Sequence, residues 1–87
     1  MELFGLGKTS WSVEFDIIRM RLELLGARLY TKRRLSQKKK FVLNQEIKTI
    51  ERLINIYALG NGPWSTKKIL RDMLQKTKEG YRICAKL

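Results

Sequence analysis

The sequence predicts an all-α fold, a small bundle of three helices. Apolar residues recur at the helical period through most of the 87 residues, and the alternation typical of β-strands is absent beyond scattered pairs. Strong turn signals are concentrated in the Gly-Asn-Gly-Pro run at residues 60–63. Hydrophobic residues make up 44% of the chain, which is sufficient for a core, and the length of residues 1–87 fits one helical domain.

The first helix is expected over residues 10–35, after an N-terminal arm at residues 1–9, with Ser10 as the N-cap. Its apolar residues form two rows at helical spacing. The first row consists of Ile18, Leu22, Leu25 and Leu29, and the second of Val13, Ile17, Met20, Leu24 and Ala27. At 100° per residue the rows lie on separate sides of the helix. Such a helix needs two neighbours, so it is either the central element of the bundle or half of a homodimer interface.

The second helix is expected over residues 37–59, where a single apolar stripe follows the helical period. The stripe consists of Leu43, Ile47, Ile50, Ile54 and Tyr57. The two glycines and the proline at residues 60–63 end this helix. Its start is less sharply defined, because Thr31 and Ser36 are the only weak breaks between Ala27 and Leu59. One long bent helix is therefore the alternative to two.

The third helix is expected over residues 65–79, with Ser65 as its N-cap and Gly80 just beyond its C-terminus. Its expected buried stripe consists of Ile69, Leu70, Met73, Leu74 and Thr77. Residues 80–87 then form either a tail or a short fourth helix.

The composition argues against enzymatic chemistry. Histidine is absent, and Cys84 is the only cysteine, so catalytic triads, His-ligated zinc and an internal disulfide are excluded. The eight acidic residues form no motif; Glu14 and Asp16, two positions apart on a helix, point about 200° from each other. We therefore expect no catalytic residues, no metal site and no cofactor.

The charge balance indicates an anionic partner. The chain contains nineteen Lys and Arg residues and eight Asp and Glu residues, which gives a formal net charge of +11. DNA or RNA is the first expectation, an acidic protein surface the second, and an anionic membrane the least expected partner. No run of 18 apolar residues occurs and the first eight residues do not resemble a secretory signal, so an intracellular location is expected, in the cytoplasm, nucleoid or nucleus.

The strongest candidate site is a basic run at residues 28–40, which contains seven cations and no acid. Its cations are Arg28, Lys32, Arg33, Arg34, Lys38, Lys39 and Lys40. Arginine forks and lysine amines at this density favour contacts with several phosphates. Tyr30 and Phe41 flank the run and either stack on unpaired bases or belong to the core. A solvated loop or a targeting signal has the same composition and stays an alternative.

A second basic cluster lies at the start of the third helix. Lys67, Lys68 and Arg71 follow the turn at residues 60–63, so they extend the first patch or, in a helix-turn-helix arrangement, read bases in the major groove. A helical hairpin with a basic polar face would look the same.

Two hypotheses result from these patterns. The first is a non-catalytic nucleic-acid-binding protein, a small regulator or a ribonucleoprotein component, in which the two basic clusters contact phosphates. The second is an interaction module that docks on an acidic protein surface as an inhibitor, adaptor or assembly subunit. In the second hypothesis Trp11, Trp64 and Tyr30 are the anchors and the basic run steers association.

Overall fold

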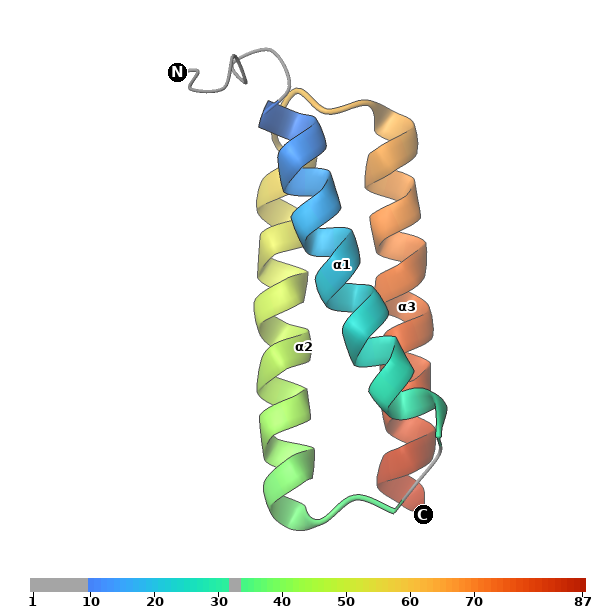
Figure 1. The fold of residues 1–87 in the computed structure, drawn as a ribbon. Coiled ribbons are helices and arrows are strands. Elements are labelled where there is room, and N and C mark those ends of the chain that lie inside the picture. Colours follow the sequence, from blue (N-terminus) through green and yellow to red (C-terminus); the bar gives the residue numbers. More distant parts are fainter. Residues whose placement is uncertain (1–9, 32–33) are drawn as a thin grey trace.

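The structure is a computed structural model, and it describes residues 10–31 and 34–87. It contains three helices, α1 (Ser10–Tyr30), α2 (Gln37–Ala58) and α3 (Trp64–Lys86), and no strand within the described residues. α2 and α3 run antiparallel, side by side, and α1 lies obliquely across both (Figure 1). The prediction of an all-α three-helix bundle is confirmed.

The core lies where the three helices meet, and one apolar row from each helix supplies it. α2 contributes all five residues of its predicted stripe, and α1 contributes its first row, Ile18 to Leu29. Phe15 and Tyr57 join α1 to the end of α2, with ring centroids 6.4 Å apart. From the predicted α3 stripe, Leu70, Leu74 and Thr77 are buried, whereas Ile69 points outward and is 45% exposed.

The prediction for the end of the first helix was too long by five residues. α1 ends at Tyr30, and the Thr31 hydroxyl donates to the Arg28 carbonyl at 3.2 Å, one of the carbonyls that the helix end leaves free. The backbone of Ser36 is extended, and its hydroxyl accepts a hydrogen bond from the Lys39 amide at 3.2 Å. This N-cap starts α2 at Gln37 as predicted, so the alternative of one long helix is wrong.

The turn between α2 and α3 is fixed by Tyr57. The Leu59 amide donates back to the Ile56 carbonyl and the Gly60 amide to the Tyr57 carbonyl, which closes the last turn of α2. The Tyr57 hydroxyl lies 2.6 Å from the Thr66 hydroxyl, and Gly62 is packed directly against the tyrosine ring. The turn and the first residues of α3 are therefore held to the core by one buried aromatic side chain.

The prediction that Ser65 caps the third helix is wrong. Pro63, with an extended backbone, occupies the cap position, and α3 begins at Trp64. Proline has no side-chain acceptor, so no side chain at the cap position bonds to the first amides of α3. The Thr66 hydroxyl donates to the Pro63 carbonyl at 2.6 Å.

The C-terminal residues continue α3 to Lys86, so the expected helix end at Gly80 and the separate tail or fourth helix at residues 80–87 were wrong. Tertiary contacts explain the continuation. A Cβ at Gly80 would lie 3.7 Å from the Leu29 Cβ, so this glycine faces α1 closely. The Tyr81 hydroxyl donates to the Lys40 carbonyl at 3.1 Å, and Cys84 is buried with its Sγ 3.5 Å from the Leu29 carbonyl oxygen.

Candidate nucleic-acid interface

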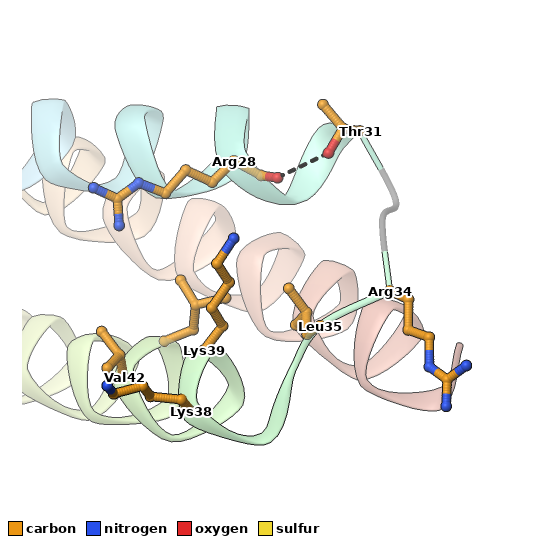
Figure 2. Close-up of a pocket in the computed structure, with 8 residues that line it drawn as sticks. Arg28, Thr31, Arg34, Leu35, Lys38, Lys39 and Val42 are labelled. Carbon is orange, nitrogen blue, oxygen red and sulfur yellow. Dashed lines mark hydrogen bonds between the residues drawn. The ribbon is translucent and has the colours of Figure 1, made fainter.

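The link between α1 and α2 brings the basic run to one end of the bundle. The C-terminal turn of α1, which lies over α3, and the N-terminal turn of α2 are both at this end of the bundle (Figures 1 and 2). The last turn of α3 reaches the same end, where Tyr81 bonds to the first turn of α2. Residues from all three helices therefore surround this end.

A groove of about 690 Å³ opens between α1 and α2 at this end (Figure 2). We call it the basic groove. Its lining residues are Arg28, Thr31, Arg34, Leu35, Lys38, Lys39, Val42 and Leu43. Three of these are apolar and four carry positive charge, and none of the eight is acidic. The groove therefore suits a ligand that combines an anionic group with a flat or apolar part.

Most of the positive charge in the basic groove has no ion-pair partner among the described residues. Arg28 pairs with Glu46 at 3.5 Å, but Arg34, Lys38 and Lys39 form no ion pair with any residue in 10–31 or 34–87. The Lys39 amine points from α2 toward α1, whereas the Arg34 guanidinium points outward (Figure 2). Charges of one sign in a concave site reinforce one another's potential.

The N-terminus of α2 adds to this positive potential. Lys38 and Lys39 lie in the first turn of α2, which contains no acidic residue. The first amides of a helix carry the positive end of its dipole, and such ends attract phosphate. The positive end of the α2 dipole therefore adds to the charge of the two lysines that line the groove.

The other predicted residues of the basic run are not among the described residues that line the groove. Lys40 is half-buried and does not line the groove, and its carbonyl accepts from Tyr81. Lys32 and Arg33 lie outside the described residues. Tyr30 and Phe41 are 83% and 65% exposed, so they are not core residues. Neither ring lines the basic groove, and Tyr30 lines a separate hollow between α1 and α3.

The second predicted cluster lies at the opposite end of the bundle. α2 has 22 residues and is about 33 Å long at 1.5 Å per residue, and it separates the start of α3 from the basic groove. The Lys67 amine donates to the Gly60 carbonyl at 2.9 Å, and Lys68 pairs with Asp72 at 3.2 Å. Only Arg71 of the three has no polar partner among the described residues.

The antiparallel course of α2 and α3 also bears on the helix-turn-helix hypothesis. The helices of that motif cross at about 90–120°, whereas α2 and α3 run alongside each other (Figure 1). The pair is a helical hairpin, the alternative given above.

Two cations that the sequence analysis did not select lie near the basic end. Arg82 and Lys86 line a hollow of about 450 Å³ between α2 and α3. They were missed because residues 80–87 were expected to leave the helix. A helical period continued past Gly80 places Lys78, Arg82 and Lys86 on one face at i, i+4 and i+8, which is the signal that would have found them.

None of the comparisons with known proteins finds a match. Protein-family models, curated protein sequences and solved structures all lack a significant counterpart of this chain. None of the described helices is both long enough and apolar enough to span a membrane. No three potential metal ligands cluster within the described part of the chain.

Proposed function

We propose that the protein binds nucleic acid without catalysing a reaction, and that the basic groove is its phosphate-binding surface. The observation that carries the proposal is a set of three cations that pair with no acid in residues 10–31 and 34–87. They are Arg34, Lys38 and Lys39, and they line a groove whose described lining contains no acid. Like charges held together cost stability unless a partner neutralises them. A nucleic-acid backbone supplies several negative charges close together, which can neutralise such a set of cations.

The apolar floor of the basic groove supports a nucleic acid over a simple inorganic anion. Leu35, Val42 and Leu43 are the apolar residues of the lining, and we call them the apolar floor of the groove. A sugar or an unstacked base can contact these side chains while its phosphate meets the lysines. Tyr30 and Phe41 are exposed but lie outside the groove lining, so they offer additional surfaces on which unpaired bases can stack.

The test measures affinity for duplex DNA, single-stranded DNA and structured RNA with the wild type and two triple variants. The site variant carries Arg34→Gln, Lys38→Gln and Lys39→Gln. The control variant carries Lys48→Gln, Arg52→Gln and Lys76→Gln, which removes the same charges from exposed positions outside the groove. The site variant should lose at least about tenfold in affinity while the control loses much less. Equal losses would show that binding depends on net charge and not on the groove.

A second candidate is docking on an acidic protein surface. Trp64 at 74% and Tyr30 at 83% exposure are available as anchors, whereas Trp11 packs against the core and is not. The basic groove would then receive carboxylates. Affinity capture before and after nuclease treatment separates the two functions, because a protein partner of this kind stays bound when nucleic acid is digested.

A further inference from the structure

The outer face of α1 carries an apolar row that the bundle leaves uncovered. The row consists of Val13, Ile17, Met20, Leu24 and Ala27, and all five are exposed. Met20 is 55% and Leu24 66% exposed. α2 and α3 lie behind α1 in Figure 1, against its opposite face. The second neighbour that the two-sided sequence of α1 requires is therefore not supplied by the described residues.

The spacing of this outer row fits another helix. Successive members are separated by four, three, four and three residues, which is an average repeat of 3.5. In the heptad notation abcdefg, Ile17 and Leu24 occupy a positions, and Val13, Met20 and Ala27 occupy d positions. A 3.5-residue seam with apolar a and d positions packs knobs-into-holes against a matching helix.

The charges beside the row select the partner and its direction. Asp16 and Glu23 occupy the two g positions on one flank, and Arg21 and Arg28 occupy e positions on the other. In a parallel pair, each g residue meets the residue five positions later in the second helix. Asp16 then meets Arg21 of a second copy, and Glu23 meets Arg28 of a second copy. The remaining e residue, Glu14, would meet residue 9, which precedes α1.

An antiparallel pair would place like charges together. In that direction g positions face g positions and e positions face e positions. With the two rows fully overlapped, Glu23 would then oppose Glu23 and Arg21 would oppose Arg21, and Glu14 with Arg28 would be the one pair of opposite charge. The parallel direction, in which opposite charges meet along both flanks, is therefore favoured for an identical helix.

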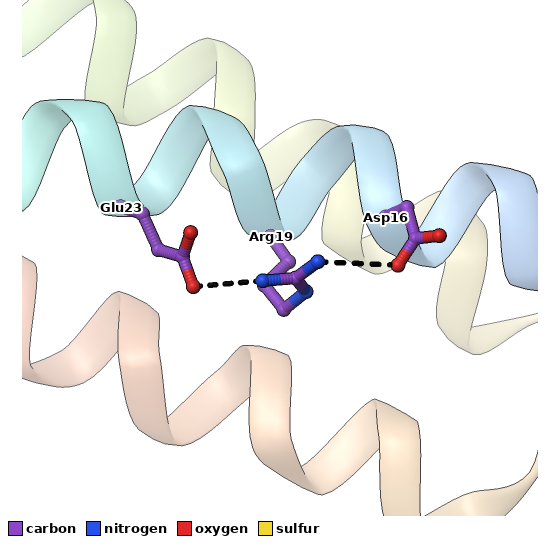
Figure 3. A network of polar contacts seen from close by, with 3 residues as sticks. All are labelled: Asp16, Arg19 and Glu23. Atoms are coloured by element: carbon purple, nitrogen blue, oxygen red, sulfur yellow. Dashed lines mark hydrogen bonds and ion pairs between the residues drawn. The ribbon is translucent and has the colours of Figure 1, made fainter.

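Arg19 holds the two carboxylates at the g positions, Asp16 and Glu23, in place within the monomer (Figure 3). Arg19 contacts Glu23 at 2.8 Å and Asp16 at 3.4 Å, and these hydrogen bonds, the one to Glu23 foremost, raise the pKa of Arg19. The carboxylate side chains stay 60% exposed at Asp16 and 53% at Glu23, so each can accept further bonds. Groups that are held in place before association lose less entropy on binding.

We propose that a second copy of this chain covers the outer row of α1, in a parallel two-fold symmetric dimer. Two heptads are too short for an isolated coiled coil, but here the bundle core already holds α1 as a helix. The two-fold axis is parallel to α1 and lies between the two copies of this helix, so both basic grooves lie at the same end of the dimer. The dimer goes beyond the proposed function and requires no nucleic acid.

Sedimentation equilibrium without nucleic acid tests the dimer, over about a hundredfold range of protein concentration. The wild type should show a monomer–dimer equilibrium, and Leu24→Glu should raise the dissociation constant at least about tenfold. Ile56→Glu, which places the same charge on an exposed apolar position of α2, should leave it unchanged. A wild type that stays monomeric, or a dimer that Leu24→Glu does not weaken, overturns the proposal.

A charge exchange tests the parallel direction. Asp16→Arg and Arg21→Asp each place like charges across the seam in a self-dimer, so each variant alone should associate at least about tenfold more weakly. An equimolar mixture of the two variants restores opposite charges at both contacts and should dimerise like the wild type. Failure of the mixture to recover, with both variants helical by circular dichroism, contradicts the parallel arrangement.

Discussion

Gly62→Ala is predicted to destabilise the protein through a clash with a buried ring. A Cβ built at Gly62 overlaps the Tyr57 hydroxyl and lies 2.7 Å from its Cζ and 3.2 Å from its Cε1. Tyr57 is 2% exposed, and its hydroxyl lies 2.6 Å from that of Thr66, so the ring has little freedom to move. The alanine methyl must displace either the ring or the turn.

The magnitude follows from two costs. Overpacking a filled core by one methyl group typically costs about 1–3 kcal/mol. Displacing the Tyr57 hydroxyl also weakens its hydrogen bond with Thr66, which contributes about 0.5–1.5 kcal/mol. Together they lower the free energy of unfolding by about 1.5–4.5 kcal/mol, which in a domain of this size lowers the Tm by at least about 6 °C.

Urea unfolding followed by circular dichroism measures this loss, with Gly26→Ala as the matched control. A Cβ at Gly26, within α1, meets no atom closer than 4 Å, so this variant should gain about 0.5–1 kcal/mol from the better helix propensity of alanine. Gly62→Ala should also lower the free energy of unfolding by less in a Tyr57→Phe background, because the tyrosine hydroxyl, the atom nearest to the new methyl group, is then absent. A Gly62→Ala variant within about 0.5 kcal/mol of the wild type would refute the packing argument.

Three further substitutions test the fold by the same unfolding measurement. Ser36→Ala removes the N-cap of α2 and should cost about 1 kcal/mol, whereas no loss would mean that the cap does not define the helix start. Gly80→Ala should gain about 0.5–1 kcal/mol, because its methyl makes an ordinary contact with Leu29 inside α3; a loss would contradict the observed spacing. Leu22→Ala, in the core, should cost about 2–5 kcal/mol, and a cost below about 1 kcal/mol would contradict its burial.

The sequence predicted α2 well because its signals agree. All five residues of its stripe, from Leu43 to Tyr57, are buried, and the glycines and proline that follow end the helix. The C-terminal part of α3 could not be predicted from local signals. Glycine often follows the end of a helix, and here tertiary contacts keep the helix continuous: the packing of Gly80 on Leu29, the Tyr81 hydrogen bond and the burial of Cys84.

The candidate site was predicted in part. Local charge density identified Arg28, Arg34, Lys38 and Lys39, which line the basic groove together. Their distance from Lys67, Lys68 and Arg71 depends on the length and direction of α2, which no pattern within either cluster records. The exposure of the outer row of α1 is likewise a property of how the helices pack, since both rows of α1 are equally apolar in sequence.

The salt dependence of nucleic-acid binding tests the central claim most directly. Each phosphate contact contributes about 0.9 to the slope of log K against log salt on duplex DNA. If Arg34, Lys38 and Lys39 each contact a phosphate, replacing the three by glutamine should reduce that slope by about 2.7. The control triple of Lys48, Arg52 and Lys76 should leave the slope near its wild-type value. Equal slopes for the wild type and the groove variant would contradict the account, because the groove would then contact no phosphate.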